Sequence, residues 1–363
     1  MIPCYNDATL EDCVTGILSV EDDTLAIEVI IVDDGSTDDG PRAAERLANR
    51  VPGIVVLRHE KTQGKGAALR TGLTAATGEF VAVQNADLEY DPADLKRLVT
   101  PLVSGEADVI IGSRFISPGC HRVPHFWHFV GNRVLTTLSN MLTDLNLTDM
   151  ESGCKAFRRE VFQSIQIEEN GLGVEAELVA KIAQMHLRIY EVGVSYRGRT
   201  YTEGKKVAMK DGWKTLYCIL KHNLHNVPVA IQFLFYTLIG GVAAIVNLLV
   251  FLSMRHAAAS VSASTLTAFC VAAAVNYYLS VKLLFRHKAR WTTWTELAAF
   301  LGVVGTVAMV DLICTRFFIG MGLADGAAKI ASTGIGLVLN FIGRKYVVFP
   351  EKSSRDWEPQ NIG

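Results

Sequence analysis

Acidic and amide side chains follow two short apolar runs in the first hundred residues. Asp33 and Asp34 end the run EVIIVDD, and Asn85 and Asp87 end the run EFVAVQNAD. Carboxylates at strand ends can hold a divalent cation, which neutralises the charge developing on a departing diphosphate. Lys65, in the glycine-flanked turn QGKGAA at a helix start, can contact phosphate. These residue types and positions predict chemistry on a substrate that carries a diphosphate.

The elements that must position these residues alternate along the chain. The sequence predicts strands within 28–39, 53–60 and 79–90, and helices over 41–50 and 64–76. Strands that alternate with helices form a mostly parallel sheet covered on both faces. Ligands of such sheets bind beyond the carboxyl ends of the strands. A single acid there would be explained by helix capping or loop solvation, whereas the ordered set favours a binding site.

Composition divides the chain into a polar part and an apolar part. The 363 residues are 50% hydrophobic, with a mean hydropathy of +0.25. Charged residues occur throughout 1–225, while long apolar runs fill 229–349. The net charge of −2 gives no basic field for nucleic acid. The seven cysteines form no CxxC pair, which favours a reduced, cytosolic setting over disulfides or a zinc site.

Four apolar segments in the second part are long enough to cross a bilayer. Residues 229–254 contain no charge, and further candidate spans lie near 261–284, 296–320 and 327–349. A buried helix of a soluble core would explain one short run but not four in succession. Because basic residues gather before the first span, between the second and third spans and at the end, we expect a cytoplasmic catalytic domain and a cytoplasmic tail at 351–363.

The membrane part contains an internal repeat with an offset of 64 residues. The expected repeats cover 229–288 and 293–352, so both enter the membrane in the same direction and are related by a pseudo-two-fold axis. Polar residues inside the spans should face the bundle interior, either as a lipid or ion path or, as we favour, as interhelical hydrogen bonds. The repeated positions are Gly241, Asn247, Asn276 and Phe285, which recur as Gly305, Asp311, Asn340 and Phe349.

Two amphipathic segments indicate contact with a membrane surface. Residues 205–228 are expected to form a juxtamembrane helix with lysines beside its apolar face. Residues 123–142 show a similar pattern, for which a membrane-surface helix and a core helix are equally good interpretations. The apolar positions are Met209, Trp213, Leu216, Leu220 and Leu224 in the first segment, and Phe126, Val130, Val134, Leu138 and Leu142 in the second.

An ordered series of short motifs resembles the family 2 glycosyltransferases with a GT-A fold. The series resembles most the polyprenyl-phosphate mannose and glucose synthases, and the membrane repeat resembles the GtrA-like domain. The resemblance implies a Rossmann-like α/β GT-A domain at 1–204, the amphipathic linker at 205–228, and an all-α domain of four transmembrane helices at 229–350. The motifs are PCYN (3–6), DDGSTD (33–38), GKGAALRTG (64–72), NAD (85–87), GSRF (112–115) and DMESGCKAFR (149–158).

The same resemblance implies roles for individual residues. Asp87, with Asn85, would bind Mg²⁺ or Mn²⁺. Catalysis would use Asp87, Arg114, Arg199 and Lys205, where an ordinary solvated basic loop is the alternative explanation for the last two. The acceptor phosphate would lie near Arg114, His128, Asn132 and Arg133. The nucleotide would be held by Pro3, Tyr5, Asp7, Asp33, Asp34, Lys65, Asn85 and Ala86.

Two features depart from the family pattern. The family usually has aspartate where this chain has Asn85, so we expect weaker metal binding and lower activity. Only Met1 and Ile2 precede the PCYN motif, so either the first strand begins upstream or the sheet lacks it. Glu175 and Glu177 could orient the acceptor or only solvate the start of a helix, and both interpretations stay open.

The sequence therefore predicts an inverting hexosyltransferase that uses a nucleotide-sugar, either GDP-mannose or UDP-glucose. The acceptor would be a polyprenyl phosphate, dolichyl or undecaprenyl, at the cytoplasmic face of a multi-pass membrane protein. An ionised phosphate needs no general base. A processive polymerase is disfavoured because no QxxRW motif occurs. The alternative from another class is a flippase or scaffold with a degenerate transferase domain, and a homo-oligomer is left open.

Overall fold

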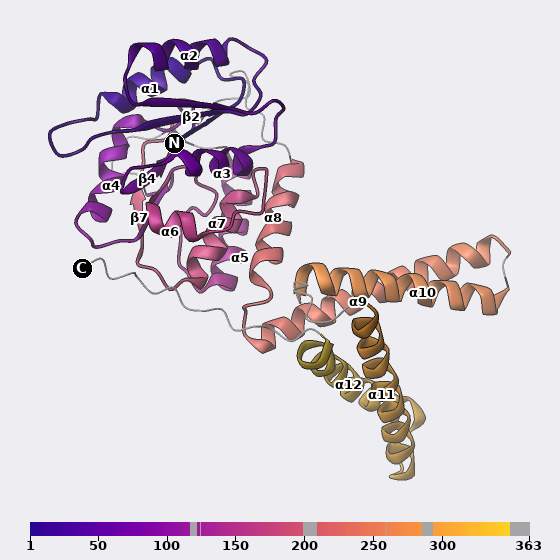
Figure 1. The fold of residues 1–363 in the computed structure, drawn as a ribbon. Coiled ribbons are helices and arrows are strands. Elements are labelled where there is room, and N and C mark those ends of the chain that lie inside the picture. The colour runs from indigo at the N-terminus through magenta and orange to yellow at the C-terminus, as the bar shows by residue number, and fades with distance from the viewer. Residues whose placement is uncertain (117–121, 124, 199–208, 259, 285–292, 349–363) are drawn as a thin grey trace. The chain divides into compact units, whose positions relative to one another are not determined.

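The computed structural model describes residues 1–116, 122–123, 125–198, 209–258, 260–284 and 293–348. These residues form two compact units. The first unit begins at Met1 and ends at His222, and the second covers Asn223–Arg355 (Figure 1).

A twisted sheet forms the centre of the first unit. Every strand pair is parallel except the two that involve β6, which runs antiparallel to both of its neighbours. The mostly parallel, Rossmann-like sheet predicted from the sequence is therefore confirmed. Its strands are β1 (Ile2–Cys4), β2 (Val29–Asp33), β3 (Ile54–Arg58), β4 (Phe80–Val83), β5 (Val109–Ser113), β6 (Lys155–Arg158) and β7 (Ile189–Gly193).

The first strand is present, although it has only three residues. It pairs with β2 over its whole length. On its other side, the Met1 amino group donates to Ala82 O at 2.8 Å and Gln84 N donates to Met1 O at 3.1 Å. These two bonds have the spacing of a parallel pair and connect β1 to β4. The expectation of a sheet without its first strand is therefore wrong.

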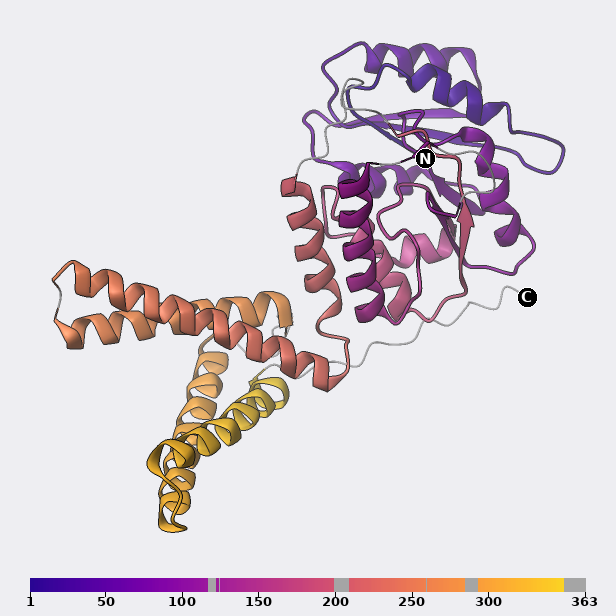
Figure 2. The ribbon, with the colours of Figure 1, turned by 180° about the vertical axis from the view of Figure 1, so that it is seen from behind.

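Helices pack on both faces of this sheet. The side chains of β2 alternate, so Ile30 and Val32 join the core on the side of α3, whereas Val29 and Ile31 join the core on the side of α1 and α2. Figure 2 shows the unit from behind. Its helices are α1 (Leu10–Leu18), α2 (Gly40–Arg50), α3 (Lys65–Ala75), the short η1 (Pro92–Asp94), α4 (Leu95–Val103), α5 (Phe126–Thr143), α6 (Arg159–Ser164), α7 (Val174–Gln184) and α8 (Met209–Asn223).

Helix α5 buries polar side chains and exposes apolar ones. Asn132, Thr136 and Ser139 are buried, while Trp127 is 79% and Met141 is 69% exposed. The apolar positions predicted to share one face are divided by the structure. Leu138 and Leu142 pack against the core, whereas Phe126 and Val134 are exposed. The core-helix interpretation therefore holds for one side of α5, and contact of the other side with a membrane surface stays a prediction.

Helix α8 attaches to the first unit and keeps an exposed aromatic side. Cys218 and Ile219 enter the core, and Trp213 is 67% exposed. Figures 1 and 2 show α5 and α8 side by side. An exposed tryptophan beside lysines is typical of a helix at a membrane surface, as the sequence predicts for the linker.

The second unit repeats one arrangement twice. Each half has two packed helices, and the second helix of each half ends in a π-helical turn. These turns begin at Ser280 and Arg344, an offset of 64 residues (344 − 280) that equals the sequence repeat. The elements are α9 (Val229–His256), α10 (Val261–Leu279), η2 (Ser280–Leu284), α11 (Thr293–Gly320), α12 (Asp325–Gly343) and η3 (Arg344–Val348).

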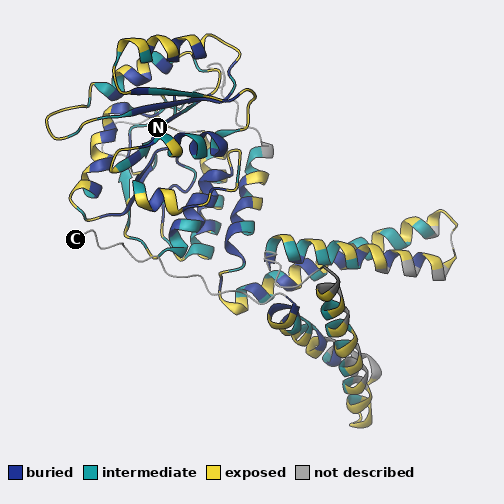
Figure 3. Ribbon diagram, in the orientation of Figure 1, coloured by how far each residue is buried: buried dark blue, intermediate teal, exposed yellow. Residues whose placement is uncertain are grey.

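Within the described residues, one helix is long and apolar enough to cross a membrane. It covers Val229–Met254, with a mean hydropathy of 2.2 and only 17% of its most apolar window buried. The remaining apolar stretches are shorter, so the four predicted spans are not confirmed by this criterion. Figure 3 shows how little of this unit is buried compared with the strands of the first unit. An apolar helix that its own unit leaves uncovered is suited to contact lipid.

Polar side chains in the second unit bind one another across the two halves. Arg344 Nη1 donates to Asn276 Oδ1 at 2.6 Å, and Lys345 donates to Gln232 Oε1. These contacts support the interpretation of the intramembrane polar residues as interhelical hydrogen bonds.

Candidate active site

The turn after β1 and the turn after β2 are joined at the carboxyl edge of the sheet. Asn6 N donates to Ser36 Oγ at 2.9 Å, and Thr37 N donates to Asn6 Oδ1 at 2.8 Å. Asn6 has a φ of 48°, in the left-handed region that asparagine tolerates better than most residues. The buried Asp33 carboxylate accepts from Ser36 N at 3.0 Å and lies 3.1 Å from Arg58 Nε. The PCYN and DDGS motifs therefore form one rigid rim.

Asp34 holds the loop that leads into α3. Its carboxylate accepts from Thr62 Oγ1, Gln63 N and Gly64 N at 2.7–2.9 Å, and His59 Nδ1 lies 2.6 Å away. Burial alone would raise the pKa of Asp34, but these hydrogen bonds outweigh it and hold the pKa below its usual value. The predicted nucleotide contact stays a prediction, because the structure assigns this carboxylate to positioning the loop.

Asp34→Asn should therefore destabilise the protein in a pH-dependent way. Because the folded pKa is lowered, the stabilisation is complete above the unfolded value of about 4 and is lost as the pH falls through the folded pKa. We expect a loss of about 2 kcal/mol at pH 6 that shrinks below about pH 4, measured by urea unfolding. Asp39→Asn, at an exposed carboxylate, should show no such pH dependence. A constant deficit across this range would contradict the charge argument.

Thr9 connects the first turn to the NAD motif. Its hydroxyl donates to Asp7 Oδ1 at 2.6 Å and also lies 3.0 Å from Ala86 O. Pro3 is part of β1, and Tyr5 is half exposed beside this turn. The predicted nucleotide residues of the amino-terminal motif therefore lie next to the segment that carries Asp87.

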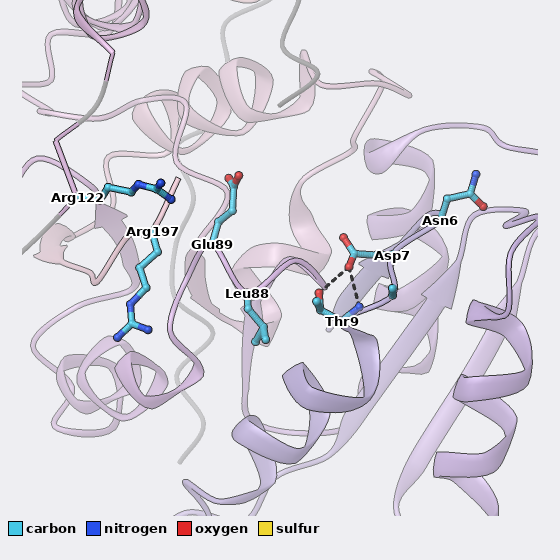
Figure 4. Close-up of a pocket in the computed structure, with 8 residues that line it drawn as sticks. Asn6, Asp7, Thr9, Leu88, Glu89, Arg122 and Arg197 are labelled. Carbon is cyan, nitrogen blue, oxygen red and sulfur yellow. Dashed lines mark hydrogen bonds between the residues drawn. The ribbon is translucent and has the colours of Figure 1, made fainter. Parts of the chain in front are cut away.

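A pocket of about 430 Å³ opens beside these residues. Figure 4 shows Asn6 and Asp7 on one side of it and the two arginines, Arg122 and Arg197, on another. Its volume lies within the range of small-molecule sites, and it combines carboxylates with guanidinium groups. The lining residues are Asn6, Asp7, Ala8, Thr9, Leu88, Glu89, Arg122 and Arg197.

Lys65 connects the glycine-rich turn to the NAD motif. Its ammonium lies 2.9 Å from Asn85 Oδ1 and 2.7 Å from Glu175 Oε1. Glu175 is buried at the start of α7 and also binds Lys155. Glu177 is fully buried too, and it accepts from the backbone N–H groups of residues 168 and 169. Solvation of a helix start is therefore the wrong explanation for both glutamates.

Arg114 is bound to an acid that the sequence analysis gave no role. Its Nε and Nη2 atoms donate to Asp149 at 2.6 and 2.7 Å, and its side chain is only 10% exposed. Asn132 Nδ2 donates to the same carboxylate at 3.2 Å. Arg114 and Asn132 therefore fix the 149–158 motif from β5 and α5. Their contact with an acceptor phosphate stays a prediction.

The structure describes two of the remaining predicted site residues and not the other two. His128 and Arg133 lie on α5, where the Arg133 side chain is exposed. Arg199 and Lys205 lie outside the described residues. We predicted that Arg199 and Lys205 lie close to Asp33 and Asp87. The described residues do not test this prediction.

The donor atoms at the end of β4 fit a divalent cation held by one charged ligand. Asp87 supplies a carboxylate, whereas the amide oxygen of Asn85 already accepts from Lys65. Magnesium is commonly held by one or two carboxylates, with substrate phosphates and water completing its coordination. Asp87 with Asn85 should therefore bind a divalent cation more weakly than two carboxylates would.

A second group of possible metal ligands is explained by ion pairs. Glu168, Glu177 and His222 place one ligand atom each within 4.8 Å of one another. Lys181 lies 2.5 Å from Glu177 and 3.3 Å from Glu168, so an ammonium already neutralises this group. The cluster therefore joins α7 to α8, and it contains none of the strand-end acids.

Sequence reasoning missed several residues of this site. Asp149 and Lys155 lie inside a quoted motif, so their positions were marked but their roles were not. Arg122 and Arg197 belong to no motif, and no spacing in the sequence indicates that they line one pocket.

The two units of this chain match two family models, one for each unit. Residues 1–166 match the family described as glycosyl transferase family 2, and residues 235–349 match the GtrA/DPMS transmembrane domain. The first unit is therefore a family 2 glycosyltransferase domain, and the second is a GtrA/DPMS transmembrane domain.

Curated relatives resemble the first unit. The chain is 27% identical to a low-salt glycan biosynthesis hexosyltransferase of Haloferax volcanii, covering 59% of this chain and 51% of the relative. It is 27% identical to the dolichol-phosphate mannosyltransferase of Pyrococcus furiosus, covering 57% and 59%. It is 28% identical to the polyprenol monophosphomannose synthase of Mycolicibacterium smegmatis, covering 55% and 77%. The chain thus spans between half and three fifths of the length of the first two.

A solved structure with some similarity is glucosyl-3-phosphoglycerate synthase from Mycobacterium tuberculosis, in complex with Mn²⁺, uridine diphosphate and glucosyl-3-phosphoglycerate. It is 25% identical, covers 62% of this chain and 79% of that chain, and gives a TM-score of 0.48.

Proposed function

We propose that this protein transfers a hexose from a nucleotide-sugar to polyprenyl phosphate at the cytoplasmic membrane face, with inversion at the anomeric carbon. Mannose is favoured over glucose because relatives are named for dolichol-phosphate and polyprenol-phosphate mannose synthesis. The main support is the convergence of the four amino-terminal motifs on one sheet edge, in a chain that also carries a GtrA/DPMS transmembrane domain.

In this reaction the main role of the protein is to position charged groups. A phosphate monoester is already largely ionised at neutral pH, so it attacks the anomeric carbon without a general base. The Asp33 and PCYN rim would hold the nucleoside, and Lys65 would contact its diphosphate. Asp87 would hold Mg²⁺ or Mn²⁺, which supplies charge neutralisation at the leaving diphosphate. Direct displacement predicts inversion.

The membrane part supports a lipid acceptor. The exposed aromatic residues of α5 and α8 are suited to the headgroup region, and the uncovered apolar surface of α9 is suited to the hydrocarbon core. Basic residues beside the spans favour a cytoplasmic first unit. Four spans, expected from the sequence repeat, remain part of this proposal.

A transfer assay tests this function. Membranes containing the full chain would be incubated with polyprenyl phosphate and radiolabelled GDP-mannose or UDP-glucose. We expect label in the organic-extractable lipid fraction, more with GDP-mannose. If no label enters lipid from either donor, with wild type or with Asn85→Asp, the transferase proposal fails and a transporter or scaffold gains support.

A further inference from the structure

A buried charged cluster lies behind the NAD motif. Lys65 contacts Asn85 Oδ1 at 2.9 Å and Glu175 Oε1 at 2.7 Å, and Lys155 contacts the second oxygen of Glu175. Lys155 is 1% exposed and Glu175 is 7% exposed. Gly153 packs on the cluster so closely that a Cβ there would lie 2.7 Å from Asn85 Nδ2 and 3.0 Å from Lys65 Nζ. The cluster is therefore a tightly enclosed assembly.

The ammonium groups of the two lysines in the cluster differ in how many protein acceptors surround them. Lys155 also donates to the carbonyl oxygens of Met150 and Ser152, so protein acceptors surround its ammonium. The Lys65 side chain is 14% exposed and makes two contacts among the described residues. An ammonium has three N–H donors, so Lys65 keeps one for a ligand. Lys65 is thus the member that can reach a substrate.

Backbone N–H groups that follow Lys65 at the start of α3 are already bonded within the chain. Gly66 N donates to Asn170 O at 2.7 Å, and Ala67 N donates to the same oxygen at 3.3 Å. A Cβ on Gly66 would lie 1.9 Å from Glu169 O, so the 169–170 segment covers this helix end. The N–H groups of Gly66 and Ala67 are therefore occupied, and the Lys65 side chain is the cationic group that the GKG turn can offer an anion.

The charges of the cluster do not cancel. Two ammonium groups share one carboxylate, because Asn85 contributes a neutral amide. Burial alone would raise the pKa of Glu175, but Lys155 and Lys65 outweigh it, so its pKa is lowered and Glu175 stays ionised. One positive charge therefore remains uncompensated within the cluster. Asn85, which contacts Lys65, lies two residues before Asp87 in the sequence.

We propose that Glu175 positions the Lys65 ammonium to bind the donor diphosphate directly, and that the neutral amide of Asn85 leaves the cluster of Lys65, Lys155 and Glu175 with one excess positive charge. This rests on the proposed use of a nucleotide-sugar. The chain then binds nucleoside diphosphate even when no divalent cation is supplied. The amide at position 85 weakens the cation site, and the fixed lysine supplies part of the positive charge that neutralises the diphosphate. Asn85 is thus a determinant of how the site neutralises phosphate.

Asn85→Asp tests the charge argument. Aspartate has nearly the same shape and would pair with Lys65, so it cancels the remaining charge and adds a second carboxylate near Asp87. Binding of GDP and UDP to the full-length protein in detergent would be measured by titration calorimetry, with EDTA or with Mn²⁺. We expect Asn85→Asp to weaken binding in EDTA about tenfold and to gain more affinity from Mn²⁺ than wild type does. Equal affinities of both proteins in EDTA would overturn the proposal.

Glu175→Gln tests the positioning role. Removing this carboxylate adds net positive charge, so charge alone predicts tighter diphosphate binding. Loss of the anchor for Lys65 predicts weaker binding, and we expect a loss of about tenfold in EDTA. Glu177→Gln is the matched control, because Glu177 is also buried, two residues along α7, but binds Lys181. It should leave the affinity unchanged.

The outcomes separate this inference from the function beneath it. If Glu175→Gln binds more tightly than wild type, the positioning role is overturned while the transferase function stands. If wild type binds GDP and UDP only with Mn²⁺, direct binding by Lys65 is overturned. If wild type binds neither nucleotide under either condition, the proposed function itself fails. Should Glu175→Gln not fold, Asn85→Asp still decides the charge argument.

Discussion

Asp87→Asn should lower hexose transfer to polyprenyl phosphate by about 10²- to 10³-fold. Asp87 provides the only carboxylate of the NAD motif, because position 85 is already an amide. Its loss leaves two neutral amides at positions 85 and 87, so a cation there would keep no carboxylate ligand from the NAD motif. The initial rate of label transfer into the lipid fraction, at saturating donor, measures the effect.

The matched control for this variant is Asp91→Asn. Asp91 lies four residues beyond Asp87, and its carboxylate accepts from Ala93 N at 3.0 Å to cap η1. Asparagine caps as well as aspartate, so the rate should change less than twofold. A wild-type rate in Asp87→Asn, at saturating Mg²⁺ and Mn²⁺, would remove Asp87 from the mechanism and leave Lys65 as the main phosphate contact.

The fold of the first unit could be predicted because its signals are local. The run that contains Ile30 and Val32 is continuously apolar, as expected for a strand buried on both faces, and the structure forms β2 there. Pro41 at the start of α2 and the GKG turn before α3 mark helix beginnings, and the helices lie where the sequence places them. The carboxyl-edge location of the strand-end acids then follows from parallel pairing.

The partners of charged residues could not be predicted in the same way. Arg114 and Asp149 are 35 residues apart in sequence, and Lys65 and Glu175 are far more distant, so no periodic pattern connects them. The sequence shows which residues carry charge, but the folded chain decides whether each charge meets a ligand or another side chain. Asp34 meets the side chains of His59 and Thr62 as well as backbone N–H groups, and Arg114 meets Asp149.

The second unit could be recognised from the sequence, but its individual membrane spans could not all be identified. Apolar composition identifies the second unit, and the offset of 64 residues matches between sequence and structure. Among the residues that the structure describes, hydropathy alone nevertheless distinguishes one helix, Val229–Met254, as long and apolar enough to cross a membrane. Polar side chains that bind one another, such as Asn276 and Arg344, lower the hydropathy of the other segments. A repeat is therefore a stronger signal for this unit than hydropathy is.

Asp149→Ala should destabilise the first unit by about 3–5 kcal/mol. The variant removes both acceptors of the buried Arg114 fork and the acceptor of Asn132 Nδ2. The guanidinium then stays buried beside the ring of Tyr196, with its Cζ 5.3 Å from the ring centroid and no counter-charge from Asp149. Urea unfolding of the full chain, followed by hydrogen–deuterium exchange of peptides from β5 and β6, would report this unit separately from the transmembrane one.

A double substitution separates the lost ion pair from the buried charge that it leaves behind. Asp149→Leu with Arg114→Met replaces both partners by apolar side chains, so it should cost less than Asp149→Ala alone, because no charge stays buried. Asp22→Asn is the exposed control. Its carboxylate pairs with Lys96 at the surface, where an ion pair contributes little to stability. If the double variant is as unstable as Asp149→Ala, the cost arises from packing of the 149–158 segment and not from the unpaired guanidinium.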